Sequence, residues 1–392
     1  MNLGKTFAKV TAVMALGMGG LMFSQATPAH AAKAYKTLSV KSVKKTAYHK
    51  AGNKGAFYNQ THTKKVVDLK ENPYTTYYVT KQATMRNSKG NNAIYYYAKS
   101  SSGVGGWIWH SYLAKGESEF GLKYAKAAVA MDATNGDVLW QHSANSQRLV
   151  ASTGKLMTIY LAVQKANKEH AWNKKISVSG SGLKAMGDSY AVGGFRFKSG
   201  HKYTFRQLYN ATLIQSSNNA AIALGRWVAG SNAAFLKKMN KQADKWNLSS
   251  KTNFVSASGL ENDDLSPFGY WDKGGYTDGN KISAKDLATV ARHLINDYPG
   301  VLNESKITSL KTDGQTLTNE NRLLKGKTFY SKSLNVDGLK TGYTPRAGLC
   351  FVGTSQKPGK HRMITVVLND QNEFTETNEL MNHVYKTANV YQ

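Results

Sequence analysis

The stretch Ala151-Ser152-Thr153-Gly154-Lys155-Leu156-Met157-Thr158 places a serine and a lysine three positions apart at the start of a predicted helix. Apolar residues recur after it at helical spacing and predict that the helix is buried: Leu156, Ile159, Tyr160 and Val163. Ser152 and Lys155 then share one helix face. Because backbone N–H groups point outward at a helix start, the position of Ser152 favours a developing oxyanion.

This pair of residue types is typical of nucleophilic catalysis. A serine hydroxyl is a poor nucleophile without a base, and Lys155 can act as that base only if its pKa falls from about 10.4 toward neutrality. Burial and a second cation nearby would lower the pKa of Lys155. Lys340 is the residue that could supply the cation. The Ser-x-x-Lys pattern alone is weak evidence, because a helix start with a solvated lysine gives the same pattern.

Two further motifs follow along the chain. Ser216-Ser217-Asn218 lies within Leu213–Ala221, where a polar cluster ordinarily marks a loop between two helices. Lys340-Thr341-Gly342 lies within Val336–Thr344, on a predicted strand. Neither motif is specific by itself. The inference rests on all three occurring in this order, each in the structural context that its role requires.

Residues 117–392 alternate predicted strands and helices. Strands are expected near both ends: Ala127–Met131 and Asp137–Gln141 around an Asn135-Gly136 turn, then Gly338–Tyr343, Leu349–Ser355 and Arg362–Leu368. Helices are expected after the capping box Thr204-Phe205-Arg206-Gln207, over Ala220–Val228 up to Gly230, and over Thr375–Val390. This order predicts an α/β (α+β) domain, with an antiparallel sheet and a helical lobe.

From about Ala125 to the end, the chain resembles the low-molecular-mass penicillin-binding proteins that are serine-type D-alanyl-D-alanine carboxypeptidases. The resemblance implies a β-lactamase/transpeptidase-like fold and removal of the terminal D-alanine from peptidoglycan stem peptides. It further implies that Ser152 is the acylated nucleophile, Lys155 its general base and Ser216 a proton relay toward the leaving D-alanine. Asn218 would hold the peptide backbone of the substrate, and β-lactam antibiotics would be covalent inhibitors.

The third motif has a physical role of its own. Lys340 and Thr341 on an edge strand offer a cation and a hydroxyl to the terminal carboxylate of the substrate, so the enzyme would read a free C-terminus. Gly342 leaves room for the substrate to lie along this strand as an added β-strand. The backbone N–H groups of Ser152 and Tyr343 are the expected oxyanion hole.

The sequence departs from the family pattern at two places. Many relatives carry a histidine before the segment Ser283–Ala288, where this chain has Asn280. The loop Leu260–Gly279 before it is long and aromatic. The only cysteine, Cys350, cannot form an internal disulfide, and its apolar neighbours predict a buried, inert thiol on a core strand.

The N-terminal part of the sequence indicates that the protein is secreted. Lysines, an apolar run over Val10–Met22 and Ala29-His30-Ala31 predict a signal peptide at residues 1–31. Residues 33–116 then hold 15 lysines and arginines but only two acids, within a chain of net charge +28. Aromatic runs separated by turn residues predict a small all-β barrel here. The run from Tyr77 through Gly106-Trp107-Ile108-Trp109 resembles the bacterial Src-homology-3-type and GW-type wall-binding modules of lactobacillus-like surface proteins.

We therefore expect a secreted, extracellular and cell-wall-associated enzyme, whose module at residues 33–116 binds anionic cell-wall polymers. A plain aromatic core with a solvated charged surface is the alternative for this segment. Nucleic acid is not expected as a partner, and no metal cluster or nucleotide fingerprint is evident, so we expect no cofactor.

Other functions remain open for the C-terminal region. A β-lactamase would use the same acylation chemistry, but it usually needs a deacylating glutamate in a Glu-x-x-Leu-Asn arrangement, which Glu261-Asn262-Asp263 does not supply. A peptidoglycan DD-endopeptidase or transpeptidase is possible, because water and an amine compete for the same acyl-enzyme. A non-catalytic wall-binding protein on a degenerate enzyme fold is disfavoured by the intact motifs.

Overall fold

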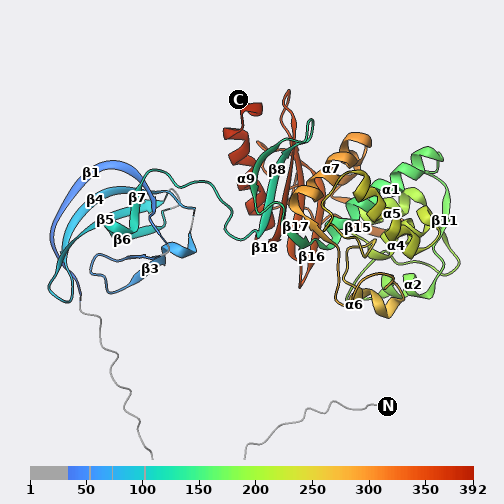
Figure 1. Ribbon diagram of the computed structural model, residues 1–392, viewed down its shortest axis with the longest axis horizontal. Coiled ribbons are helices and arrows are strands. Elements are labelled where there is room, and N and C mark those ends of the chain that lie inside the picture. Colours follow the sequence, from blue (N-terminus) through green and yellow to red (C-terminus); the bar gives the residue numbers. More distant parts are fainter. Residues whose placement is uncertain (1–33, 53, 73, 101–102) are drawn as a thin grey trace, which may run out of the picture. The chain divides into compact units, whose positions relative to one another are not determined.

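The structure is a computed structural model that describes residues 34–52, 54–72, 74–100 and 103–392 (Figure 1). The predicted signal peptide, residues 1–31, lies outside these residues. The chain divides into two compact units, with the boundary between Ser118 and Glu119. Among the described residues, no helix combines the length and the apolar composition needed to cross a membrane.

The N-terminal unit is built on one antiparallel sheet of seven strands in the order β3-β2-β6-β5-β4-β1-β7. The strands are β1 Lys36–Lys50, β2 Ala56–Tyr58, β3 Lys65–Asp68, β4 Tyr77–Arg86, β5 Asn92–Ser100, β6 Gly105–Trp109 and β7 Leu113–Lys115. The long strand β1 pairs with β4 over most of its length and with β7 through its last three residues. Strand β1 thus joins β4 to β7 within one sheet.

The hairpin between β4 and β5 shows how the sequence specifies this sheet. The side chain of Asn87 accepts hydrogen bonds from the backbone N–H groups of Lys89 and Asn91, and Gly90 has a φ of 86°. Asparagine and glycine are the residues that favour such a turn. The core of this unit combines aliphatic and aromatic side chains, and the rings of Phe57 and Tyr77 are fully buried and 4.7 Å apart.

The C-terminal unit is built around a five-stranded antiparallel sheet in the order β16-β17-β18-β8-β9. Its strands are β8 Ala127–Asp132, β9 Val138–His142, β16 Val336–Thr344, β17 Gly348–Gln356 and β18 Arg362–Asp370. All five predicted strands are confirmed. The Asn135-Gly136 turn is also confirmed, since Asn135 accepts a hydrogen bond from the N–H of Asp137 at 2.9 Å and Gly136 has a φ of 87°.

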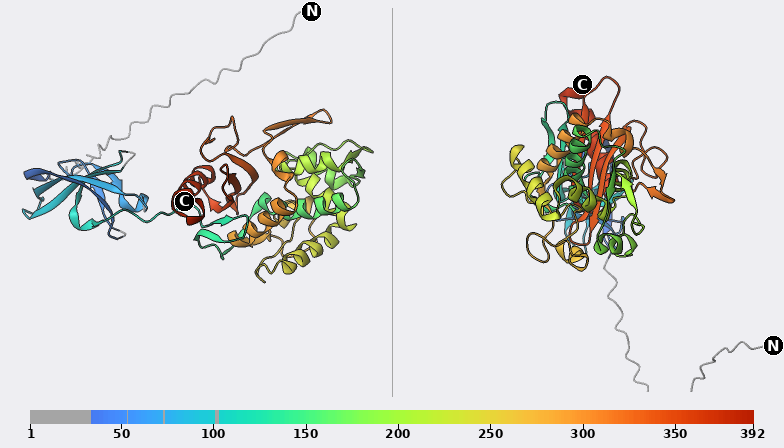
Figure 2. Two further views of the ribbon diagram at one scale, coloured as in Figure 1. Left: turned by 90° about the horizontal axis from the view of Figure 1, so that it is seen from above. Right: turned by 90° about the vertical axis from the view of Figure 1, so that its right-hand side faces the viewer.

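Both faces of this sheet are covered, which explains why its central strands are apolar throughout. Side chains alternate between the faces: Val129 and Val366 face the helical lobe, whereas Ala128 and Val367 face α9, Glu373–Thr387. Figures 1 and 2 show α9 on one side of the sheet and the remaining helices on the other. Strand β16 is an edge strand, so within the described residues no strand pairs with its outer side.

The helical lobe carries most of the other elements. Its helices are α1 Lys155–Lys168, α2 Ser181–Asp188, α3 Phe205–Leu213, α4 Asn218–Ala229, α5 Asn232–Lys245, α6 Asn262–Leu265, α7 Ala284–Asp297 and α8 Val301–Ser305. Three antiparallel strand pairs join them: β10 Gln147–Leu149 with β13 Lys281–Ser283, β11 Lys175–Ser177 with β12 Lys202–Thr204, and β14 Ser309–Thr312 with β15 Gln315–Thr318.

The predicted capping box is present at the start of α3. The hydroxyl of Thr204 accepts a hydrogen bond from the N–H of Gln207, and the side chain of Gln207 accepts one from the N–H of Thr204. The predicted stop of α4 at Gly230 is also confirmed, with a φ of 86° at this glycine. The α3–α4 pair packs beside α1, and the loop between them enters the candidate active site.

Candidate active site

Ser152 lies in a 3₁₀ turn, Ala151–Gly154, and α1 begins only at Lys155. The expectation that Ser152 itself begins the helix was therefore wrong. In a 3₁₀ turn the side chains at positions i and i+3 eclipse, so the tighter turn still brings Ser152 and Lys155 to one side. Ala151, directly before the serine, has a φ of 46°, a region that non-glycine residues adopt rarely.

The side chain of Lys155 is fully buried and its Nζ has three oxygen partners. These are the Oγ of Ser152 at 2.7 Å, the Oδ1 of Asn218 at 2.7 Å and the backbone oxygen of Ser258 at 2.6 Å. The carbonyl of Ser258 can only accept a hydrogen bond. The amide of Asn218 is held in one orientation, because its Nδ2 donates to the backbone oxygen of Val192 at 2.6 Å.

Among these three contacts, only the one with Ser152 allows a proton to pass to Lys155. Two of the three partners of Lys155 require a donor from its Nζ, whereas the hydroxyl of Ser152 can either accept or donate. A neutral amine has two N–H groups and one lone pair. It can satisfy Ser258 and Asn218 with its two N–H groups and still accept the proton of the Ser152 hydroxyl with its lone pair.

The electrostatics of the site favour the neutral form of Lys155. Burial lowers the pKa of Lys155 well below its usual value, and the positive charge of Lys340 lowers this pKa further. Burial also lowers the pKa of Lys340 itself to about 8. The carboxylate of Glu320 opposes the shift at both lysines. The second cation that the sequence predicted beside Lys155 is therefore Lys340.

The Ser216-Ser217-Asn218 motif lies at the junction of α3 and α4: Ser216 and Ser217 are in the loop, and Asn218 is the first residue of α4. Ser217 is the N-cap of α4, its Oγ accepting from the N–H of Ala220 at 3.3 Å and donating to Asn219 at 2.7 Å. Ser216 is half-buried and has a φ of 61°. Its hydroxyl has no hydrogen-bond partner among the described residues, so the proton-relay role of Ser216 stays a prediction.

The third motif lies on the edge strand β16, where a substrate carboxylate was expected. Lys340 is 2% exposed and its Nζ donates to the backbone oxygen of Thr341 at 3.1 Å. Tyr343 is 61% exposed. A Cβ added at Gly342 would lie 3.0 Å from the backbone nitrogen of Ser152 and 2.9 Å from that of Thr153. Gly342 therefore lets β16 pack directly on the serine turn.

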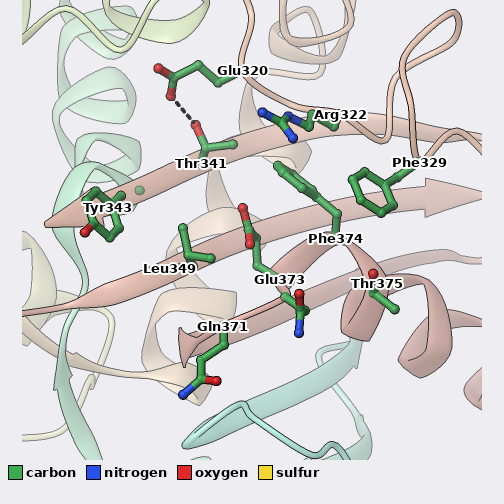
Figure 3. A pocket seen from close by; sticks show the side chains of 12 residues that line it. Glu320, Arg322, Phe329, Thr341, Tyr343, Leu349, Gln371, Glu373, Phe374 and Thr375 are labelled. Carbon is green, nitrogen blue, oxygen red and sulfur yellow. Dashed lines mark hydrogen bonds between the residues drawn. The ribbon is translucent and has the colours of Figure 1, made fainter. Parts of the chain in front are cut away.

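A pocket of about 500 Å³ continues from this strand toward the start of α9 (Figure 3). The hydroxyl of Thr341 donates to Glu320 at 3.3 Å at one end of the pocket. The predicted site did not include Glu320, since no recognisable motif places an acid next to the residues that are expected to bind a carboxylate. The lining residues are Glu320, Arg322, Phe329, Thr341, Gly342, Tyr343, Leu349, Gln371, Asn372, Glu373, Phe374 and Thr375.

Asn280 is buried and hydrogen-bonds to two segments next to the candidate active site. Its Oδ1 accepts hydrogen bonds from the N–H groups of Val255 and Ser256 at 2.8 and 2.9 Å, and its Nδ2 donates to the oxygen of Ser256 at 2.9 Å. Its backbone oxygen accepts from the N–H of Val150 at 3.2 Å. Asn280 thus connects the segment before Ser258 with the segment before Ser152.

Cys350 is buried on β17. Burial raises the pKa of its thiol to about 12. A thiol with this pKa is not a nucleophile at neutral pH. The prediction of an inert core cysteine is confirmed.

A family model described as D-alanyl-D-alanine carboxypeptidase matches residues 117–372. The D-alanyl-D-alanine carboxypeptidase DacD of Escherichia coli is 31% identical over 247 residues, which cover 62% of this chain and 58% of the relative. DacF of Bacillus subtilis, also named a D-alanyl-D-alanine carboxypeptidase, is 30% identical over 255 residues, covering 62% and 57%. The chain thus spans less than two thirds of the length of these relatives.

Solved structures share the fold. A peptidoglycan synthesis regulatory factor, PBP3 of Streptococcus pneumoniae, is 34% identical with a TM-score of 0.64, covering 68% of this chain and 73% of that chain. Penicillin-binding protein D2 of Listeria monocytogenes, solved in its ampicillin-bound form, is 31% identical with a TM-score of 0.54, covering 68% and 99%. The family model begins at residue 117 and therefore leaves residues 1–116 unmatched.

Proposed function

Because the chain belongs to the D-alanyl-D-alanine carboxypeptidase family, peptidase family S11, we propose that it removes the terminal D-alanine from peptidoglycan stem peptides through an acyl-enzyme on Ser152. The observation that carries this proposal is the 2.7 Å contact between the Nζ of Lys155 and the Oγ of Ser152. It joins a hydroxyl to a buried amine whose pKa is lowered, which is the arrangement of a nucleophile with its base.

Acylation follows from this contact. The Oγ of Ser152 attacks the carbonyl carbon of the penultimate D-alanine while its proton passes to the Nζ of Lys155. Collapse of the tetrahedral intermediate breaks the C–N bond, and the nitrogen of the terminal D-alanine takes up a proton through Lys155 and Ser216. Water then attacks the ester on Ser152, which releases the shortened peptide and restores the hydroxyl.

Positioning of the substrate falls to β16 and Asn218. Lys340 and Thr341 would bind the terminal carboxylate, with Thr341 exchanging Glu320 for the substrate. The open side of β16 would pair with the peptide backbone, and Asn218 would hold it from the opposite side. The N–H groups of Ser152 and Tyr343 would stabilise the oxyanion, and losing one such donor costs about 3 kcal/mol.

β-Lactams would react at the same serine. The ampicillin-bound structure belongs to the Listeria protein, and the proposal extends that reaction to Ser152 of this chain. A β-lactam carries a carboxylate and a strained amide, so it would use the carboxylate-binding residues of β16 and the same nucleophile.

The identity of the products tests the proposed function. The full chain is incubated with a soluble pentapeptide ending in D-Ala-D-Ala, and the products are separated and weighed by mass spectrometry. A carboxypeptidase releases free D-alanine and a tetrapeptide. Adding an amine acceptor and a cross-linked dimer as second substrates separates this outcome from transpeptidation and cross-bridge cleavage. Cleavage of the dimer without release of D-alanine would instead assign an endopeptidase.

We propose that the N-terminal unit binds anionic cell-wall polymers and that residues 1–31 direct the enzyme out of the cell. Exposed lysines lie over half-buried aromatic rings of its sheet. The Nζ of Lys45 is 4.6 Å from the ring centre of Tyr78, and those of Lys81 and Lys99 are each 5.8 Å from that of Tyr97. Such cations remain available to a polyanion, because aromatic rings do not neutralise them.

A groove of about 800 Å³ lies in the same unit and gives the polymer a second kind of contact. The aromatic residues that line it are Tyr35, Tyr58, Tyr95, Trp109 and Tyr112. Of these, Trp109 is 39% exposed. Sedimentation of the full chain with purified walls tests the proposal. Binding should weaken in Lys81→Gln/Lys99→Gln and with added salt, and walls stripped of their anionic polymers should bind less. Salt-independent binding to stripped walls would overturn it.

A further inference from the structure

One short segment, Ser258–Asp263, contacts three parts of the candidate active site. The backbone oxygen of Ser258 accepts a hydrogen bond from the base Lys155 at 2.6 Å. Gly259 packs on the nucleophile turn, where an added Cβ would lie 2.0 Å from the oxygen of Ala151 and 3.0 Å from the nitrogen of Ser152. Glu261 then reaches β16, because its Oε1 accepts a hydrogen bond from the hydroxyl of Thr344 at 2.7 Å.

The backbone of Ser152 is therefore enclosed between two glycines. Gly342 on β16 and Gly259 on the segment Ser258–Asp263 both approach the nitrogen of Ser152 so closely that an added Cβ would lie 3.0 Å from it. Glu261 lies two residues after Gly259, and Thr344 lies two residues after Gly342. The hydrogen bond between Glu261 and Thr344 joins the two segments to each other. The turn of Ser152, β16 and the segment Ser258–Asp263 thus each contact the other two.

Glu261 joins the segment Ser258–Asp263 to β16 from a buried position. Its side chain is 1% exposed, and a buried carboxyl without a partner would be costly. The hydroxyl of Thr344 that donates to Glu261 also accepts from the N–H of Ala347 at 3.1 Å. Glu261 thus fixes the turn that follows β16. An outer ion pair, Arg346 with Asp263 at 2.6 Å, joins the same two segments at the surface.

We propose that Glu261, through Thr344, is a positioning residue that holds the end of β16 against the turn of Ser152 and so fixes the oxyanion-binding N–H of Tyr343. This role rests on the proposed function of Ser152. Tyr343 directly precedes Thr344, and β16 is an edge strand whose last pair with β17 is Thr344 with Gly348. Without Glu261, this end of the strand would lose its only buried side-chain hydrogen bond to the segment Ser258–Asp263 among the described residues, and the outer Arg346–Asp263 pair would remain.

Losing the hydrogen bond between Glu261 and Thr344 should slow the chemical step of acylation. An oxyanion donor stabilises the transition state more than the ground state, so a displaced Tyr343 N–H slows acylation. Binding of the substrate carboxylate by Lys340 and Thr341, earlier on the strand, is little affected. A misplacement of about 1 Å costs up to about 100-fold in rate, and we expect about tenfold for a partial release.

The test uses the full chain with Thr344→Val, Glu261→Ala, Glu261→Gln and the double variant Glu261→Ala/Thr344→Val. The rate constant for acylation by a fluorescent penicillin is measured, together with kcat and KM for a D-Ala-D-Ala peptide. Thr344→Val and Glu261→Ala should slow acylation and kcat about tenfold with KM changed less than about twofold. Glu261→Gln, whose amide oxygen still accepts from Thr344, should keep most of the rate.

Two controls separate positioning from other roles. Asp263→Asn breaks only the outer ion pair and should leave acylation near the wild-type rate, and the double variant should be no slower than either single variant. Unchanged acylation in folded Thr344→Val, or an equal loss in Glu261→Gln and Glu261→Ala confined to deacylation, would overturn the proposal. The second result would make Glu261 a base for water. A wild-type chain that penicillin does not acylate would contradict the proposed function instead.

Discussion

The Nζ of Lys155 lies 2.7 Å from the Oγ of Ser152, and its two other partners are oxygens that need a donor from it. This relationship determines which proton can move. Only the contact with Ser152 can reverse its direction when the amine becomes neutral, so burial and the charge of Lys340 act directly on the reactivity of the serine.

Replacing Lys155 by arginine tests whether this residue acts as a base or only as a charge. Arginine keeps the positive charge but stays protonated at all accessible pH values. Lys155→Arg should therefore lower the rate of penicillin acylation by about 100-fold or more. Stopped-flow fluorescence with a labelled penicillin measures this rate. A variant that folds and is acylated at close to the wild-type rate would remove Lys155 from the mechanism.

The pKa of Lys340, lowered by burial to about 8, predicts an alkaline limit for peptide substrates. Lys340 is charged below this pH and neutral above it, so its attraction for the terminal carboxylate is lost as the pH rises through about 8. The value of kcat/KM for a peptide with a free C-terminus should fall over this range.

The matched control for this pH profile is Lys340→Arg. An arginine at this position remains charged, so any activity that the variant retains should no longer fall near pH 8. A peptide with an amidated C-terminus should show a much weaker dependence with the wild-type chain. The same falling limb in Lys340→Arg would mean that another group limits the reaction.

Gly342→Ala tests the close packing of β16 on the serine turn. The new Cβ would lie 2.9 to 3.0 Å from backbone atoms of Val150, Ser152 and Thr153. Backbone cannot give way cheaply, so acylation should slow at least tenfold, and stability should fall by about 1–3 kcal/mol. Gly300→Ala is the control, since nothing lies within 4 Å of its Cβ position. Equal rates in the two variants would contradict the packing argument.

Asn280→Ala tests the support beneath the site. The substitution leaves the buried N–H groups of Val255 and Ser256 without their acceptor. The free energy of unfolding should fall by about 2 kcal/mol or more, measured by urea denaturation. Asn382→Ala on the exposed face of α9 should change it by less than about 0.5 kcal/mol. Similar losses in both variants would show that Asn280 has no special role.

Much of the fold could be predicted because its signals are local. The Asn135-Gly136 turn, the capping box at Thr204 and the runs of apolar residues in β17 and β18 depend on neighbouring residues alone. The 3₁₀ turn at Ser152 was missed because serine and lysine three positions apart fit an α-helix equally well. Gly259 and Gly342 approach this turn through tertiary contacts, which no local sequence pattern predicts.

The candidate site likewise contains residues that local motifs predict and contacts that only the tertiary structure reveals. Ser152, Lys155, Asn218 and Lys340 carry motif chemistry, and their motifs lie together in the structure. The contact of Lys155 with Ser258 uses a backbone carbonyl 103 positions away, which any residue type could supply. In the sequence, Glu261 stands out only beside the question of a deacylating base, whose motif it does not supply. Its hydrogen bond to Thr344 depends on the tertiary placement of the Leu260–Gly279 loop beside β16.

The most direct measurement of the central claim is the intact mass of the full chain after exposure to benzylpenicillin, with peptide mapping of the adduct. One added penicillin should be attached to the peptide that contains Ser152. Ser152→Ala should carry no adduct and should keep the wild-type melting temperature within a few degrees. An adduct that persists in Ser152→Ala, or that maps to another serine, would contradict the claim.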